Sequence, residues 1–273
     1  TKYSFPIYEK IFQEENIPEE IKYLSVVESA LNPHAVSRVG ATGLWQFMPT
    51  TGKVYGLDIN EWVDERKDPV AASYAAAAYL RDSYDQFDDW LLAIASYNCG
   101  RGNVERAINK AGGQYDFWAI RSFLPAETQN YVPAYIATVY AMNYHKQHSI
   151  TPGVADFTIH TEVLQVNHKV SLASIAQAAN VNVRELSILN PSYLREVINA
   201  SPESPKSLIL PVLNNNTYSA LYEVLYGNSE PPAVASRYNT KPVPKHRPMY
   251  YKVRNGDNLY AIAKKYDVEI QDL

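Results

Sequence analysis

One carboxylate in the 273-residue sequence lies where a helix would be expected to present an apolar side chain. At helical spacing, Glu28 falls on the same stripe as Ile17, Ile21, Leu24 and Leu31. No Lys or Arg lies one helical turn away from Glu28, and burial raises the pKa of a carboxyl group. A carboxyl group that keeps its proton near neutral pH can act as a general acid.

A buried glutamate can also be satisfied by a distant Arg or by backbone groups, and the pattern alone allows both interpretations. The residues that follow favour a functional site. Pro33, Gly40 and Gly43 end the helix and require irregular backbone, which is where proteins often place binding atoms beside a rigid element. We expect this segment to fold back over Glu28.

Four short motifs occur in a fixed order along the chain: ESALNPHAVS (28–37), GATGLWQFMP (40–49), ASYNCGRGNV (95–104) and ETQNYV (127–132). In this order they resemble the motif set of the soluble-lytic-transglycosylase (SLT) family, and four motifs are more specific than any one short pattern. The resemblance implies a mainly α fold, with a lysozyme-like α-helical catalytic domain over residues 1–150.

The resemblance also implies an activity, which is cleavage of the β-1,4 bond between N-acetylmuramic acid and N-acetylglucosamine in peptidoglycan. Most glycosidases divide this chemistry between two carboxylates. The family manages with one, here Glu28, which acts first as acid and then as base. The C6 hydroxyl of the same muramic acid replaces water, so that the product carries a 1,6-anhydro end. No metal or organic cofactor is expected.

Further motif residues are expected to bind substrate in this family: Ser37, Gln46, Met48, Tyr97, Asn98, Glu127 and Tyr131. Ser37 would position the acetamido group of the substrate, although its spacing equally fits a serine that caps a turn. Gln46 and Met48 would line sugar subsites, whereas their neighbour Trp45 could be either core or platform.

Tyr97 and Asn98 are expected to face the cleft, with the Tyr97 phenol close enough to hydrogen-bond the Glu28 carboxyl. Glu127 and Tyr131 lie one helical turn apart. Glu127 is the obvious second carboxylate, but the resemblance implies that it anchors structure and substrate and does not act as a nucleophile.

The elements that must position these residues are predicted to be helices up to residue 148. Asp68 and Pro69 have the character of a helix start, and the strong helix formers 71–80 follow them. Residues 90–97 predict another helix, and Pro125 opens the last one. Asp64, Asp68, Asp88 and Asp89 are expected to be solvated or capping groups.

After Pro152 the composition changes, and β-branched residues predict a strand over 156–166, with Phe157, Ile159, Thr161 and Val163 on one side. Residues 172–186 then recur at 259–273. Both copies resemble LysM modules, which are small βααβ units that grip glycans. Lys169 and Val170 replace the usual Gly-Asp pair in the first copy, so a structural or docking role is expected at least as much as glycan binding.

The expected organisation is therefore a catalytic domain (1–150), a degenerate LysM-like α/β module (155–214), a Pro-rich linker (215–248) and a truncated second LysM module (249–273). The net charge of −4 argues against nucleic acid as a partner. The single cysteine, Cys99, leaves the redox compartment undecided. The sequence has the character of a fragment, and we expect a monomer, exported to the periplasm or outer membrane, with a lipid anchor outside the fragment and glycan strands as its partner.

Two other functions compete with this expectation. A goose-type-lysozyme-like hydrolase would use the same fold and acid, but it would need a positioned water and usually another carboxylate. A non-catalytic wall-binding protein would use only the LysM copies. The presence of the acid and all four motifs argues against such a loss of catalysis.

Overall fold

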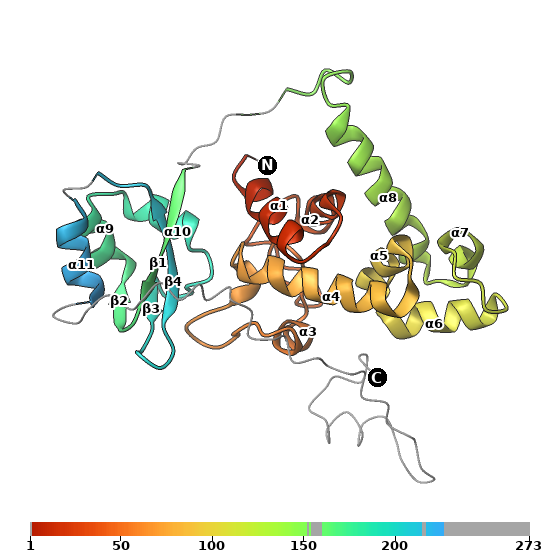
Figure 1. The fold of residues 1–273 in the computed structure, drawn as a ribbon, viewed down its shortest axis with the longest axis horizontal. Coiled ribbons are helices and arrows are strands. Elements are labelled where there is room, and N and C mark those ends of the chain that lie inside the picture. Colours follow the sequence, from red (N-terminus) through yellow and green to blue (C-terminus); the bar gives the residue numbers. More distant parts are fainter. Residues whose placement is uncertain (1, 152, 154–159, 215–216, 227–273) are drawn as a thin grey trace, which may run out of the picture.

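The computed structural model describes residues 2–151, 153, 160–214 and 217–226, and Figure 1 shows their arrangement. The N-terminal part is helical, as the sequence predicts, and an α/β module follows it. Among the described residues, no helix has both the length and the apolar character needed to cross a membrane. The helices of the N-terminal part are α1 (Ser4–Glu14), η1 (Glu19–Tyr23), α2 (Leu24–Ser29), α3 (Pro49–Val54), η2 (Glu65–Lys67), α4 (Ala71–Phe87), α5 (Trp90–Cys99), α6 (Arg101–Lys110), α7 (Phe117–Ile120), η3 (Arg121–Phe123) and α8 (Ala126–Asn143).

Helices α4 and α5 form the centre of the helical domain. The small side chains of Ala75–Ala78 are buried and allow α5 to approach closely. The predicted helix start at Asp68 is confirmed, because its carboxylate accepts hydrogen bonds from the Val70 and Ala71 amides at 2.9 Å. Asp89 caps α5 in the same way through the Leu92 amide at 2.7 Å.

The helix predicted across Ile17–Leu31 is shorter than the periodicity indicates. It begins as the 3-10 segment η1, continues as α2 and ends at Ser29, because Ala30 and Leu31 both adopt the left-handed conformation with φ of 51° and 62°. The apolar stripe is still buried against the core, with Leu24 fully buried and Leu31 partly buried. Glu28 therefore lies in the last turn of a short helix.

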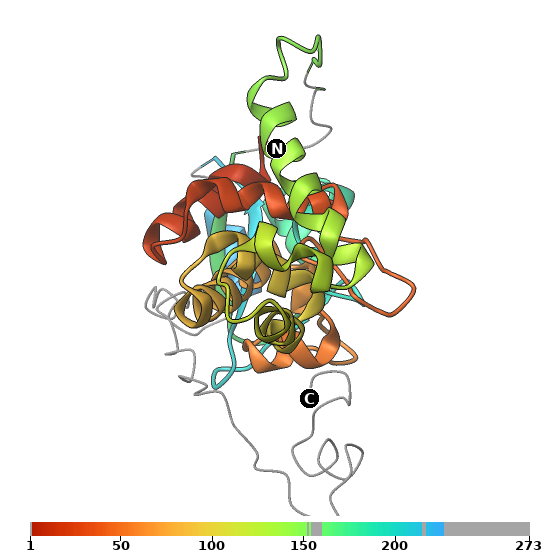
Figure 2. The same cartoon turned by 90° about the vertical axis from the view of Figure 1, so that its right-hand side faces the viewer.

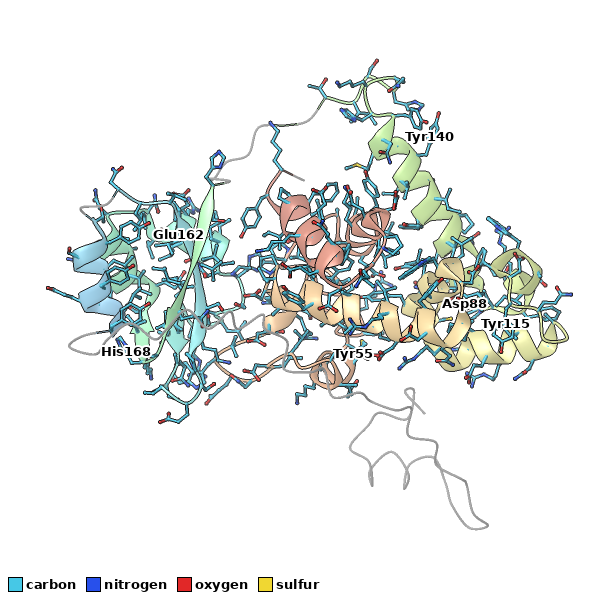
Figure 3. All side chains as sticks on the ribbon, viewed as in Figure 1. Tyr55, Asp88, Tyr115, Tyr140, Glu162 and His168 are labelled. Atoms are coloured by element: carbon cyan, nitrogen blue, oxygen red, sulfur yellow. The ribbon has the colours of Figure 1, made fainter. Side chains whose placement is uncertain are left out.

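Helix α8 begins after Pro125, as predicted, and carries Pro133 in its interior. Proline at this position cannot donate a hydrogen bond to the carbonyl of Gln129, and the Arg121 guanidinium binds that carbonyl at 2.7 Å in its place. The first half of α8 buries Tyr131 and Tyr135 in the core. The second half extends away from the domain, and Tyr140 is exposed there (Figures 2 and 3).

The α/β module (residues 160–214 and 217–226) contains two small antiparallel sheets, β1 (Thr161–Val166) with β4 (Lys206–Pro211) and β2 (Lys169–Ser171) with β3 (Val197–Asn199). In the first sheet Thr161 pairs with Pro211 and Val166 with Lys206. Between β2 and β3 lie α9 (Leu172–Ala179) and α10 (Val183–Leu189). Of the strand predicted over 156–166, residues 156–159 lie outside the described part. In the remainder Leu164 and Val166 contribute to the module core, whereas Val163 is 42% exposed.

The linker predicted from residue 215 is wrong in its first part. Residues Tyr218–Tyr226 form helix α11, which packs on α9, and Leu221 and Leu225 are fully buried in the module core. Apolar residues at helical spacing therefore outweigh the proximity of the Pro-rich stretch. The rest of the predicted linker and the second LysM module lie outside the described residues.

Candidate active site

The Glu28 carboxyl group lies at the junction of α2 and α8. It is half-buried, and the phenol of Tyr131, which is buried on α8, donates a hydrogen bond to its Oε1 atom. Within the described part of the chain, no Lys or Arg forms an ion pair with Glu28. The alternative of a glutamate neutralised by a distant Arg is therefore not what the structure shows.

Burial raises the pKa of Glu28 to about 7, although the hydrogen bond from Tyr131 acts in the opposite direction. The charge of Glu127, in the first turn of α8, raises it further. The protonated and the ionised form of the carboxyl group are therefore both populated near neutral pH. This is the property that a group needs in order to donate a proton and then recover one.

The hydrogen bond expected between Tyr97 and Glu28 is not formed. The Tyr97 phenol instead donates to the Trp45 carbonyl at 2.8 Å, and Tyr131 makes the bond to the carboxyl group. Tyr97 nevertheless lies close enough for the charge of Glu28 to contribute to raising its pKa, after the larger effect of burial. Two phenols from α5 and α8 thus lie near the same acid, but only one binds it.

A segment that we call the glycine loop, residues 40–48, packs against the helix that carries Glu28. The hydroxyl groups of Ser25 and Ser29 on α2 both donate to the Leu44 carbonyl at 2.8 Å. Trp45 is core and not platform, because it is fully buried and its indole nitrogen donates to Ser73 at 2.9 Å. The segment therefore folds back onto the helix that carries Glu28, as predicted, and it is held there by hydrogen bonds from the two serines.

The side chain of Gln46 braces the glycine loop from within. Gln46 has a left-handed backbone, with φ of 49°, and its amide nitrogen donates to the carbonyls of Gly43 at 2.9 Å and Ala35 at 3.2 Å. Met48 is half-buried and immediately precedes α3. Ser37 caps a tight turn, since its hydroxyl accepts from the Ala41 amide at 3.0 Å. These contacts support the structural alternative that the sequence left open for Ser37.

Asn98 and Glu127 belong to the junction between α5 and α8. The Asn98 side-chain oxygen accepts a hydrogen bond from the Thr128 hydroxyl at 2.7 Å. Glu127 is exposed beside this contact, where a negative charge in the first turn also favours the helix. Of the predicted site residues, Tyr97, Glu127 and Tyr131 thus share the electrostatic environment of Glu28.

The buried pair Asp64 and Arg66, which the sequence did not reveal, supports the glycine loop from the other side. The guanidinium binds both carboxylate oxygens of Asp64 at 2.8 and 2.9 Å, and it donates to the carbonyls of Gly40 and Phe47 at 3.0 and 3.1 Å. These carbonyls lie 26 and 19 residues away in sequence, so no local spacing could reveal the contact. Asp64 was expected to be solvated or capping. It is buried, and it does cap η2, because its carboxylate accepts a hydrogen bond from the Arg66 amide at 3.2 Å.

Comparison with known families gives three matches along the chain. Residues 6–118 match the transglycosylase SLT domain. Residues 160–227 match the LysM-like domain of the lytic transglycosylase MltD, and residues 251–273 match the LysM domain. The second match includes α11, in agreement with the packing of that helix in the module core.

Two relatives agree with these family matches at the level of sequence. Membrane-bound lytic murein transglycosylase D of Escherichia coli (strain K12) is 34% identical over 262 residues, which cover 94% of this chain and 56% of that protein. Soluble lytic murein transglycosylase of Salmonella typhimurium is 33% identical over 116 residues, covering 40% of this chain and 18% of that protein. The solved structure of the 70 kDa soluble lytic transglycosylase of Escherichia coli matches 52% of this chain and 24% of its own, with 27% identity and a TM-score of 0.46.

The chain spans little more than half the length of the first of these relatives. Its matches nevertheless follow one another in the order that the motifs and the repeat predict. The chain therefore belongs to the family of lytic murein transglycosylases in which an SLT domain is followed by LysM-like domains.

Proposed function

We propose that the protein is a peptidoglycan lytic transglycosylase that cleaves the β-1,4 bond between N-acetylmuramic acid and N-acetylglucosamine and leaves 1,6-anhydromuramic acid ends. The observation that carries this proposal is the state of Glu28. This acid is half-buried without an ion pair among the described residues, and its pKa is raised to about 7.

In the proposed reaction, protonated Glu28 transfers its proton to the bridging oxygen as the bond from that oxygen to C1 of muramic acid breaks. The glucosamine side leaves as an alcohol, and positive charge develops at C1. The Glu28 carboxylate then takes the proton of the C6 hydroxyl while the C6 oxygen bonds to C1. The Tyr131 hydrogen bond stabilises the ionised form of Glu28 that exists between the two transfers.

The remaining site residues are proposed to bind and orient the glycan. Met48 and Gln46 would line sugar subsites on the glycine loop, and Ser37 would meet the acetamido group. Tyr97 would contribute to glycan binding by holding the backbone of the glycine loop, to which its phenol donates a hydrogen bond. Asn98 would contribute by holding the junction between α5 and α8. Glu127 and Tyr131 would fix the substrate and the acid from α8.

Hydrolysis is a second candidate, and the exposure of Glu127 is the observation that favours it. An exposed carboxylate that acts on the pKa of Glu28 could activate a water molecule for attack at C1. The two reactions can be distinguished by digesting peptidoglycan in heavy-oxygen water and analysing the ends of the products. A hydrolase incorporates the heavy oxygen at new reducing ends, whereas a transglycosylase forms anhydro ends without incorporation.

The decisive experiment digests purified sacculi with the native protein, Glu28→Gln and Glu127→Gln, followed by mass spectrometry of the released muropeptides. We expect anhydro products from the native protein and a loss of about a hundredfold or more in Glu28→Gln. Glu127→Gln should keep the anhydro product. If reducing ends dominate and disappear in Glu127→Gln, the protein is a hydrolase. If sacculi are bound but never cleaved, it is a wall-binding protein.

Glycan strands of peptidoglycan are the proposed partner, and this substrate also supports a location in the periplasm or at the outer membrane. The relative that matches most of the chain is named a membrane-bound enzyme. An anchor outside these residues is proposed on the same basis, and a monomeric state stays a prediction from the sequence.

A further inference from the structure

The helical domain and the α/β module are joined by a continuous contact. We call residues 58–66 of the helical domain the docking segment. Val63 forms an antiparallel bridge with Tyr193 of the module. On either side of it, the Leu194 amide donates to the Trp62 carbonyl at 3.0 Å, and the Asp64 amide donates to the Ser192 carbonyl at 2.9 Å. The docking segment thus pairs with the module as an added strand does.

Side chains reinforce this backbone pairing. Val63 is only 4% exposed and belongs to the hydrophobic core of the module, although it comes from the helical domain. Two cations of the module lie over the Trp62 ring, with the Lys169 nitrogen 4.3 Å and the Arg195 guanidinium 4.5 Å from its centroid. Lys206 of β4 forms an ion pair with Asp58.

The same segment contacts the glycine loop on its other side. Asp64, whose amide binds the module, holds the Arg66 guanidinium through both carboxylate oxygens. Arg66 in turn binds the Gly40 and Phe47 carbonyls at the two ends of the glycine loop. Between these ends, the Leu44 carbonyl is bound by two serines of the helix that carries Glu28.

We propose that docking of the α/β module positions the glycine loop for catalysis, and that Arg66 is the positioning residue through which this docking acts. The inference rests on the proposed function, because it assigns the glycine loop to the substrate site. In this account the module binds the docking segment of the helical domain through Lys169, Arg195 and the backbone of residues 192–194. The module contributes to turnover by fixing the shape of the glycine loop. This effect does not require a glycan on the surface of the module that contacts the docking segment.

Val63→Asp is the sharpest test in the full chain, because the new carboxylate would be buried in the module core when docked and would lie in water when undocked. Val183→Asp is the matched control, since Val183 is 38% exposed on the same module. Lys206→Glu is an independent second variant that places like charges beside Asp58 and Glu65. Val63→Ile keeps the apolar contact and should restore native behaviour.

Hydrogen exchange reports docking through the Asp64 and Leu194 amides, and it reports the glycine loop through the Thr42 and Gly43 amides, which bind the Phe47 and Ala35 carbonyls. In Val63→Asp and Lys206→Glu we expect exchange at all four amides to rise about tenfold or more, while α5 stays protected. KM for glycan should rise several-fold with a smaller change in kcat, and the pH profile set by Glu28 should not move.

The proposal is overturned if the docking amides exchange freely while the loop amides and KM keep their native values. Failure of the proposed function would be recognised separately. In that case the native protein would give no anhydro products, yet the exchange measurement would still show whether the loop depends on docking.

Discussion

Glu28 combines two opposing influences on a single carboxyl group. Burial favours the protonated form, and the Tyr131 phenol favours the ionised form. A group balanced in this way can lose and regain a proton at little cost near neutral pH. A glutamate paired with an arginine would remain ionised and could not act as the acid.

The stability of the protein should reveal this state of Glu28. In the folded protein the Glu28 carboxyl has a pKa of about 7, against an ordinary value of 4.5. At a pH between these two values the folded chain keeps this proton, whereas the unfolded chain has lost it. The contribution of this carboxyl group to stability therefore falls as pH rises from 4.5 through 7. Glu28→Gln should be more stable than native by up to about 3 kcal/mol above this range and equal to it below. Urea unfolding across pH measures this, and a constant difference at every pH would contradict the assignment.

Tyr131→Phe removes the donor that stabilises the ionised carboxylate. The pKa of Glu28 should rise further, so the alkaline limb of the kcat/KM profile should move to higher pH, while kcat falls. Tyr135→Phe, one turn along the same buried face of α8, is the matched control and should leave the limb in place. An alkaline limb that stays fixed in Tyr131→Phe would mean that another group titrates.

At the scale of the elements, the glycine loop depends on a close approach of two backbones. Gly43 has φ of +86°, and a Cβ atom there would lie 1.8 Å from the Arg66 carbonyl oxygen. Gly40 has a similar φ of +90° but open space around it. The two glycines therefore separate the effect of contact from that of backbone conformation.

Gly43→Ala should lower the free energy of unfolding by about 3 kcal/mol or more and reduce activity, because the loop must move away from Arg66. Gly40→Ala should cost only about 1 kcal/mol, which is the strain of the left-handed backbone alone. Chemical denaturation and sacculus digestion test both variants. Equal costs at the two positions would show that the contact with Arg66 is unimportant.

The sequence predicts the elements well where local chemistry determines them. Asp68 and Asp89 cap helices as their types indicate, and the place of Glu28 in an apolar stripe predicts that burial raises its pKa. Prediction from the sequence fails where contacts join segments that are distant along the chain. The partner of the Glu28 carboxyl is Tyr131 and not Tyr97, and the support of the glycine loop by Arg66 depends on a fold that brings distant carbonyls together.

At the scale of the whole molecule, the module is larger than the sequence indicates, because α11 completes its core. Leu221→Ala should therefore destabilise the module by about 2–5 kcal/mol, since this side chain is fully buried. Tyr222→Ala, at a 40% exposed position on the same helix, should change stability little. Thermal unfolding of the full chain measures both. If Leu221→Ala left stability unchanged, α11 would not be part of the module core, and the sequence-based assignment of this segment to the linker would stand.

The first LysM-like module has Lys169 where the expected pattern has glycine, and the structure gives this residue a contact with the helical domain. That residue lies over Trp62 of the helical domain, so its side chain serves the contact between the two parts. Replacement of a motif residue is here consistent with a docking role, which the sequence allowed.

The most direct test of the account is a carbon-13 NMR titration of the Glu28 carboxyl, assigned by the signal that is lost in Glu28→Gln. The account predicts a midpoint at about pH 7. A midpoint at the ordinary value of 4.5 would mean that Glu28 is ionised under working conditions and cannot be the proton donor.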